Sequence, residues 1–162
     1  MPKPNIYLET TVISYLTAWT SRDIIREGHR QLTRAWWDHH RQKYDLFISQ
    51  VVLDEIARGD PTAAADRIAV TQDIPLLPIN PSIDALAQEL VQQHSLPPRA
   101  LQDAYHIATA AIHGIDILLT WNCNHIANPH ILQKVRRQLT ASNLAVPEIA
   151  TPEALLGEEN DA

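Results

Sequence analysis

Several short segments, far apart in the chain, carry side chains with oxygen atoms. Glu9 ends the apolar run "NIYL", Glu55 lies in "LDEIAR", and Asp103 lies in "LQDAYH". Asn122 and Asn124 follow the apolar run "ILLT". Hard cations such as Mg²⁺ and Mn²⁺ prefer oxygen ligands, and they bind phosphate oxygens and activate water. If the fold brings these segments together, the chain carries the groups needed for phosphodiester hydrolysis.

Each of the three acids also has an ordinary structural explanation. Glu9 could be a solvated acid at the end of a strand, although glutamate is disfavoured in strands and its neighbours are apolar. Glu55 could lie on the exposed face of a short helix, beside Asp54 and Arg58. Asp103 could stabilise the first turn of a helix through its charge. The metal-binding interpretation therefore requires that the three acids meet at one place.

Nitrogen and sulfur ligands are too scattered for a zinc site. The eight histidines show no HExxH pattern, and Cys123 with His125 and His130 supplies too few converging ligands. Tyr105 and His106, which follow Asp103 on the same predicted helix, are interpreted as core or rim residues. The four tryptophans are interpreted as anchors of the core rather than as platforms on which bases stack.

The elements that must position the acids alternate between strands and helices. Short apolar runs predict strands over residues 4–9, 44–49, 74–79 and 115–120, and an edge strand near Pro147, which cannot donate to a central ladder. Helical periodicity and helix caps predict helices at 10–18, 21–40 with Ser21 as N-cap, 50–58 with Ser49 as N-cap, 61–72, 81–94, 96–114, 128–139 and a final turn after 150.

This alternation predicts a parallel sheet with helices on both faces. We expect a single α/β domain over residues 1–157 and a disordered tail over 158–162. In such sheets, ligands bind outside the carboxyl ends of the strands. Glu9 and Asn122 are expected at that edge, and Glu55 and Asp103 on helices next to it.

Composition narrows the class of protein. Of 162 residues, 45% are apolar and 20% are charged, which is typical of a globular chain. The formal charge of −6 argues against a protein that coats nucleic acid without specificity. We expect no transmembrane span and no signal peptide, and the single cysteine suits a reducing cytoplasm.

Taken together, the motifs resemble the PIN domain, and in particular the VapC-type toxins of bacterial type II toxin–antitoxin pairs. The resemblance runs from about Asn5 to Leu156 and rests on the segments "IYLETTVISYL", "SQVVLDEIARG", "LQDAYHIATAAIHGIDILLTWN" and "HIAN". It implies a PIN-like three-layer α/β/α sandwich with a central, mainly parallel sheet. It also implies a cytoplasmic Mg²⁺- or Mn²⁺-dependent endoribonuclease that is usually dimeric and is neutralised by a small antitoxin.

The resemblance assigns roles to particular residues. Glu9, Glu55 and Asp103 match three acids of the family's catalytic and metal-binding set, and Asn122 stands where a fourth acid, an aspartate, is common. Thr10 and Thr120 match the hydroxyl residues that accompany the acids, and Asn124 stands where a further aspartate is often found. Arg58 and Arg99 lie next to the acidic segments in sequence and are candidates for contact with RNA phosphates.

Two kinds of departure from the family pattern bear on activity. Glu9 in place of an aspartate lengthens the ligand by one methylene, roughly 1.5 Å of bond length, but keeps a carboxylate. Asn122 and Asn124 keep a carbonyl oxygen and lose a negative charge, so weaker metal binding is expected rather than none. In the expected mechanism Glu9 and Asp103 bind the metal, Glu55 completes the site, and Asn122 is a neutral partner.

Two other functions remain open from the sequence. The chain could be a catalytically impaired PIN-fold protein that acts by binding RNA or an antitoxin. It could also be an α/β enzyme of another class, such as a phosphotransfer receiver or an aspartyl-phosphate hydrolase. Those enzymes need a nucleophilic aspartate and a lysine at strand ends, which the predicted strands lack, so we expect the ribonuclease.

Overall fold

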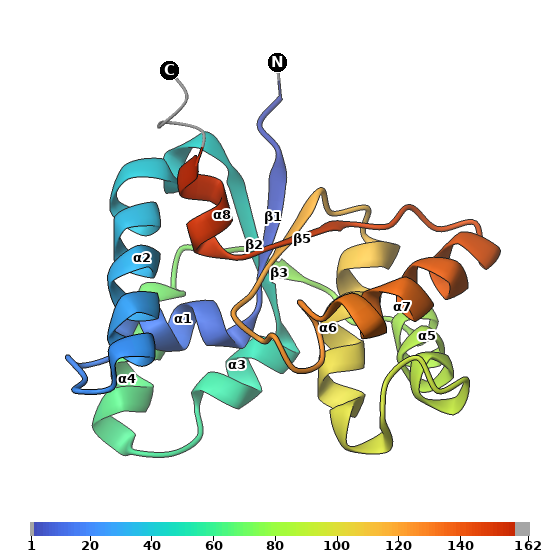
Figure 1. The fold of residues 1–162 in the computed structure, drawn as a ribbon, viewed down its shortest axis with the longest axis horizontal. Helices are drawn as coiled ribbons and strands as arrows, with labels where there is room; N and C mark the ends of the chain where they lie inside the picture. The colour runs from blue at the N-terminus through green and yellow to red at the C-terminus, as the bar shows by residue number, and fades with distance from the viewer. Residues whose placement is uncertain (1, 158–162) are drawn as a thin grey trace.

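In a computed structural model, which describes residues 2–157, a five-stranded sheet forms the centre of the protein (Figure 1). Its strands are β1 (Asn5–Leu8), β2 (Asp45–Ser49), β3 (Leu76–Leu77), β4 (Ile117–Leu119) and β5 (Glu148–Ala150). Their order across the sheet is β3-β2-β1-β4-β5, and every neighbouring pair is parallel. The predicted parallel sheet is confirmed, and β5 is an edge strand as expected for a segment that contains Pro147.

Helices cover the sheet on two sides. They are α1 (Thr10–Thr17), α2 (Ile24–His40), α3 (Gln50–Ile56), α4 (Pro61–Val70), α5 (Pro81–Gln92), α6 (Leu101–Ile112), α7 (Pro129–Ala141) and α8 (Pro152–Leu156). Figure 1 shows α1, α2, α4 and α8 to one side of the sheet and α5, α6 and α7 to the other. This is the α/β/α sandwich that the sequence predicts. The predicted tail, 158–162, lies outside the described residues.

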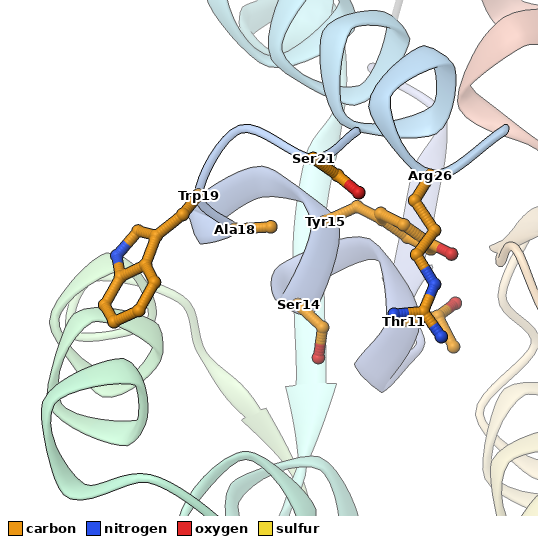
Figure 2. A pocket seen from close by; sticks show the side chains of 7 residues that line it. All are labelled: Thr11, Ser14, Tyr15, Ala18, Trp19, Ser21 and Arg26. Atoms are coloured by element: carbon orange, nitrogen blue, oxygen red, sulfur yellow. The ribbon is translucent and has the colours of Figure 1, made fainter. Parts of the chain in front are cut away.

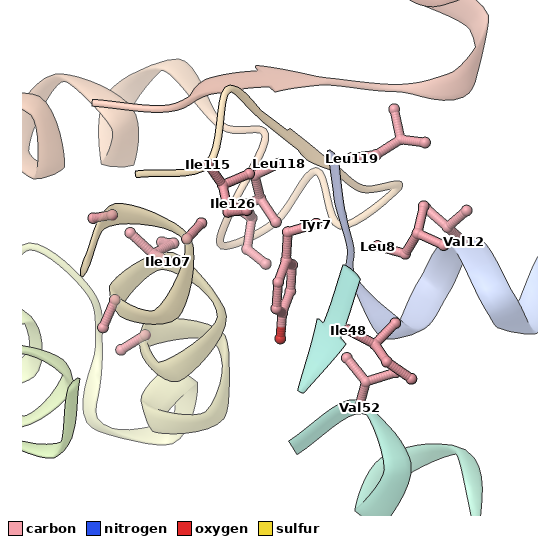
Figure 3. Close-up of a cluster of buried hydrophobic side chains, with 14 of the residues drawn as sticks. Tyr7, Leu8, Val12, Ile48, Val52, Ile107, Ile115, Leu118, Leu119 and Ile126 are labelled. Atoms are coloured by element: carbon pink, nitrogen blue, oxygen red, sulfur yellow. The ribbon is translucent and has the colours of Figure 1, made fainter. Parts of the chain in front are cut away.

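The core forms on both faces of β1 and β4 because successive side chains of a strand point to opposite faces. Tyr7 pairs with Leu118, and Leu8 pairs with Leu119, and all four are fully buried. In Figure 3, Leu8 and Leu119 lie on the side of Val12 from α1, whereas Leu118 lies on the side of α6. The Tyr7 ring therefore extends into the layer between the sheet and α6.

The helix termini follow local capping chemistry. Asp60 accepts a hydrogen bond from the Ala63 N–H at the start of α4, and Asn80 accepts one from the Ile83 N–H at the start of α5. The predicted N-cap at Ser21 is wrong, because Asp23 accepts hydrogen bonds from the N–H groups of the first turn of α2. Helix α2 therefore begins at Ile24, and residues 18–23 form an exposed loop.

Two other boundaries differ from the sequence prediction for reasons of backbone chemistry. Residues 74–79 pair only at Leu76 and Leu77, because Pro75 and Pro78 have no N–H to donate to the ladder. The predicted helix over 96–114 begins with a 3₁₀ turn at Pro98–Ala100 and continues as α6. The register of β1, β2 and β4 is unaffected by either difference, so the expected carboxyl edge is preserved.

Burial of the tryptophans differs from the expectation that all four anchor the core. Trp36 is fully buried and Trp121 nearly so, but Trp19 is 69% exposed in the loop between α1 and α2. Among residues 2–157, no helix is long and apolar enough to span a membrane.

Candidate functional site

Glu9 is buried at the carboxyl edge of the sheet, directly after β1. Its backbone N–H donates to the Leu119 carbonyl, 3.0 Å away, which continues the pairing of β1 with β4. The Thr120 hydroxyl donates to Glu9 Oε1 over 2.6 Å, and the Thr11 hydroxyl donates to the same oxygen. Burial raises the pKa of the Glu9 carboxyl, although the charge of His106 and the two hydroxyl groups oppose the shift. The edge thus holds a buried carboxylate that neighbouring polar groups stabilise.

Glu55 projects from α3 toward His106, which lies fully buried on α6. Its Oε1 accepts a hydrogen bond from the Thr10 hydroxyl, 2.9 Å away, and lies 2.6 Å from His106 Nε2. On the other side of the imidazole, His106 Nδ1 lies 2.6 Å from the Tyr7 hydroxyl, which is 2.8 Å from Ser49 Oγ. Ser49, the N-cap residue of α3, makes no side-chain hydrogen bond to its own helix. The expected capping role of this serine is replaced by a buried polar chain from β2 to α3.

The charge of His106 is set by the three acids around it. Burial by itself opposes a charged imidazole, but the hydrogen bond to Glu55 and the charges of Glu9, Glu55 and Asp103 outweigh it and raise the pKa of His106. For Glu55, burial acts to raise the pKa, and the hydrogen bond and charge of His106 reverse this and lower it. Three carboxylates from three separate elements therefore act on one buried imidazole.

Asp103, in the first turn of α6, is held by two residues that follow β4. Asn122 Nδ2 donates to Asp103 Oδ1 over 3.1 Å, and His125 Nδ1 lies 3.0 Å from Asp103 Oδ2. Asn122 Oδ1 accepts the His125 N–H, 3.0 Å away, so the asparagine also closes the turn that carries the histidine. Asn122 therefore orients the Asp103 carboxylate through its amide group, which an aspartate could not do.

The five other predicted site residues are two threonines, two arginines and Asn124. Thr10 and Thr120 make the contacts with Glu55 and Glu9 described above.

Arg99 and Asn124 are exposed and line a shallow hollow of about 500 Å³ together with His125. Arg58 is exposed at the end of α3, and its charge acts to lower the pKa of Glu55. The two threonines thus contact the acids directly, whereas Arg99 and Asn124 line the hollow beside His125.

The donor set fits a hard divalent cation in chemistry, because it consists of carboxylate and amide oxygens. Within residues 2–157, however, no group of three or more histidine, cysteine, aspartate and glutamate side chains is placed to hold a metal ion. The acids are instead held by hydroxyl groups, by the Asn122 amide and by His106. Each carboxylate thus accepts hydrogen bonds from its own neighbours.

Sequence reasoning missed the two histidines that contact the acids. His106 lies three residues after Asp103, a spacing that puts both side chains on one face of a helix, and that spacing is visible in the sequence. His125 was considered only as a zinc ligand. No sequence signal points to its contact with Asp103, because the contact depends on the turn that Asn122 closes.

Comparison with known proteins gives one family and a fold. The model of the PIN domain family matches residues 6–125 of the chain. A comparison with curated protein sequences finds no match.

Two similar solved structures have TM-scores of 0.57 with this chain. One is the crystal structure of Mycobacterium tuberculosis VapC20, a sarcin–ricin loop cleaving toxin, with 17% identity over 74% of this chain and 92% of its own. The other is VapBC2 from Rickettsia felis bound to a DNA fragment from their promoter, with 12% identity over 90% of this chain and 97% of its own. At these identities the likeness establishes a shared fold.

Proposed function

The chain belongs to the PIN domain family, and from this premise we propose that it is a divalent-metal-dependent endoribonuclease, the toxin of a toxin–antitoxin pair. VapC20, whose solved structure has a similar fold, is described as a sarcin–ricin loop cleaving toxin, and this description supports RNA as the substrate. The similar VapBC2 structure supports a small antitoxin as a partner. A homodimer is a further proposal, which rests on the resemblance to VapC-type toxins.

The observation that carries this proposal is that three carboxylates from separate elements act on one buried imidazole. Glu9 follows β1, Glu55 lies in α3 and Asp103 begins α6, and all three act on His106. Acids that merely keep a helix surface in contact with water are not expected around a buried imidazole. Bringing several charges together out of water costs free energy unless the charges are compensated. The arrangement is typical of a site built to hold positive charge.

We propose that Glu9 and Asp103 hold Mg²⁺ or Mn²⁺, directly or through water, and that Glu55 completes the site. The cation supplies charge to stabilise the phosphate oxygens and to activate water. Glu55, held by Thr10 and His106, is placed to orient the attacking water. Asn122 holds the Asp103 carboxylate in position.

The exposed arginines supply positive charge at the edges of the acidic site. Arg99 lies on one wall of the hollow next to His125, which itself contacts Asp103. A guanidinium there can make paired hydrogen bonds to a phosphate of the RNA. In the proposal, Arg58 makes a similar contact with a phosphate near the end of α3. The two arginines offset the repulsion between the acids and the RNA backbone.

A cleavage assay with matched variants tests the proposal. Purified protein is incubated with single-stranded RNA in Mg²⁺, Mn²⁺ or EDTA, beside Glu9→Gln, Asp103→Asn and the control Asp54→Asn. Asp54 is exposed on α3 one residue before Glu55, so its loss removes a charge without touching the site. Cleavage that needs metal, disappears in the two site variants and persists in the control supports the nuclease.

A second candidate function is favoured by Asn122. Asn122 is uncharged, and its amide group donates a hydrogen bond to the Asp103 carboxylate. The site therefore carries less negative charge than a set of four acids would. The candidate is a PIN-fold protein with impaired catalysis that acts by binding RNA or an antitoxin. Protein that is folded and free of antitoxin but fails to cleave RNA with either metal would favour it.

A further inference from the structure

A pocket lies beside the acidic site, between α1, the loop over residues 18–23 and the first turn of α2. Its volume is about 380 Å³, and Figure 2 shows the side chains around it, among them Ser14, Tyr15, Trp19 and Arg26. This pocket combines an exposed indole, several hydroxyl groups and a guanidinium group. The proposed mechanism uses none of these four side chains.

We propose that this pocket holds one nucleotide of a single-stranded RNA, with the base against Trp19 and a phosphate at Arg26. The inference rests on the proposed ribonuclease function and names a part of the substrate that the acids do not contact. The hydroxyl groups of Ser14 and Tyr15 offer donors and acceptors to the ribose and base.

Trp19 has the exposure and position of a stacking platform. It is 69% exposed in a loop, although an indole is among the side chains that gain most from burial. Figure 2 shows its ring at one end of the set of lining side chains, with Arg26 at the other end. Stacking of an aromatic ring on a base is tolerant of sequence and suits single-stranded nucleic acid.

Arg26 provides positive charge that no acid of the described chain compensates. Among residues 2–157, no hydrogen bond or ion pair engages its guanidinium group, whereas Arg30, one turn further along α2, forms a double hydrogen bond with Glu27. Figure 2 shows the Arg26 side chain extending over the pocket toward Thr11. In a chain of net charge −6, a guanidinium without an acidic partner among the described residues is a natural contact for a phosphate.

Thr11 links the pocket to the buried Glu9 carboxylate. This residue lines the pocket, donates a hydrogen bond to the Glu9 carboxylate and accepts the Trp121 N–H, 2.8 Å away. In the proposal, the nucleotide at Trp19 and Arg26 belongs to the same RNA strand as the bond that is cleaved at the acids. This link favours RNA over a protein ligand, because a strand must pass both places.

RNA affinity can be measured without cleavage in the full-length chain that carries Asp103→Asn. A fluorescein-labelled single-stranded RNA is titrated by fluorescence anisotropy, and Trp19→Ala and Arg26→Gln are compared with Arg22→Gln and Ile25→Ala. The control residues are exposed neighbours that do not line the pocket. Equal melting temperatures for all variants show that the fold is intact.

The proposal predicts separate effects for the two pocket residues. Trp19→Ala weakens RNA binding about 5- to 100-fold, since one stacked base is lost. Arg26→Gln weakens binding and reduces the slope of log Kd against log salt by about 0.7, since one phosphate contact on a single strand is lost. Both control variants bind as the parent does.

The outcomes separate this pocket from the nuclease itself. Unchanged affinity and salt slope in both pocket variants overturn the nucleotide pocket, even if the wild-type chain cleaves RNA. Weaker binding in both variants supports the pocket, even if the wild-type chain shows no cleavage. If Ile25→Ala weakens binding of a protein partner together with Trp19→Ala while RNA binding stays unchanged, the surface serves a protein and the proposal is overturned.

Discussion

Replacing His106 by alanine removes the imidazole on which Glu9, Glu55 and Asp103 act. The side chain is fully buried, and it contacts Glu55 Oε1 and the Tyr7 hydroxyl at 2.6 Å each. Its loss leaves Glu55 and Tyr7 without these partners and removes the imidazole on which the charges of all three carboxylates act. Removing one partner of a buried, hydrogen-bonded charge pair costs about 3–5 kcal/mol.

For a chain of this size, a change of that magnitude lowers the melting temperature by about 6–20 °C. The assay is chemical and thermal denaturation of His106→Ala beside His113→Ala. His113 lies just after the same helix, and its ring Nε2 lies 2.8 Å from the Pro78 carbonyl oxygen, so loss of this contact is expected to cost about 1 kcal/mol.

A double-mutant cycle with Glu55→Gln separates the charge interaction from the loss of packing. If the imidazole compensates Glu55, the double variant is less destabilised than the sum of the two single variants by about 1 kcal/mol or more. A cost of His106→Ala below that of His113→Ala, or strict additivity with Glu55→Gln, would refute the view that His106 neutralises the acids.

Three further perturbations give distinct expectations. Asn122→Asp removes the amide donor to Asp103 and adds a charge, so the variant should lose about 1–3 kcal/mol of unfolding free energy without metal and should bind Mg²⁺ more strongly. The control Asn124→Asp, at an exposed position, should change neither quantity. Denaturation and isothermal titration calorimetry measure the two effects, and an Asn122→Asp chain as stable as the parent would contradict the hydrogen bond to Asp103. Mg²⁺ at about 100 times its Kd should stabilise the wild-type chain by about 2.7 kcal/mol, or about 5–11 °C in melting temperature, and should leave Asp103→Asn unchanged; equal gains in both chains would locate the ion elsewhere. Hydrogen bonds from Arg30 lower the pKa of Glu27 from 4.5 to about 2, so the stabilising effect of the Glu27 carboxylate is present above pH 4.5 and is lost as the pH falls toward 2. Glu27→Gln should flatten the dependence of unfolding free energy on pH in that interval. An unchanged profile would contradict the contact between Arg30 and Glu27.

The order of strands and helices could be predicted because it depends on short-range patterns. Apolar runs bounded by turn residues located β1, β2 and β4, and Pro61, Pro81 and Pro129 stand in the first turns of their helices as propensity predicts. The limits of β3 were missed because two prolines removed ladder donors inside an apolar run. Exposure of Trp19 was missed because residue type alone does not say whether a loop folds back onto the core.

The acids of the site could be predicted from their placement, but their partners could not. Parallel strands bring Glu9 and Thr120 to one edge whatever the details of packing, so their proximity follows from topology. The contact of His106 with Glu55 depends on how α3 and α6 pack against the sheet, and no local pattern encodes that packing. The role of Asn122 likewise depends on a turn of the backbone that forms only after β4.

The chemistry of the cleaved ends tests most directly whether these acids support metal-dependent hydrolysis. Water activated by a divalent cation leaves a linear phosphate monoester on the product, whereas attack by the neighbouring 2′-hydroxyl of the RNA leaves a 2′,3′-cyclic phosphate. We predict linear phosphate ends in Mg²⁺ or Mn²⁺ and intact RNA in EDTA. Cyclic phosphate ends, or cleavage that persists in EDTA, would contradict the proposed site.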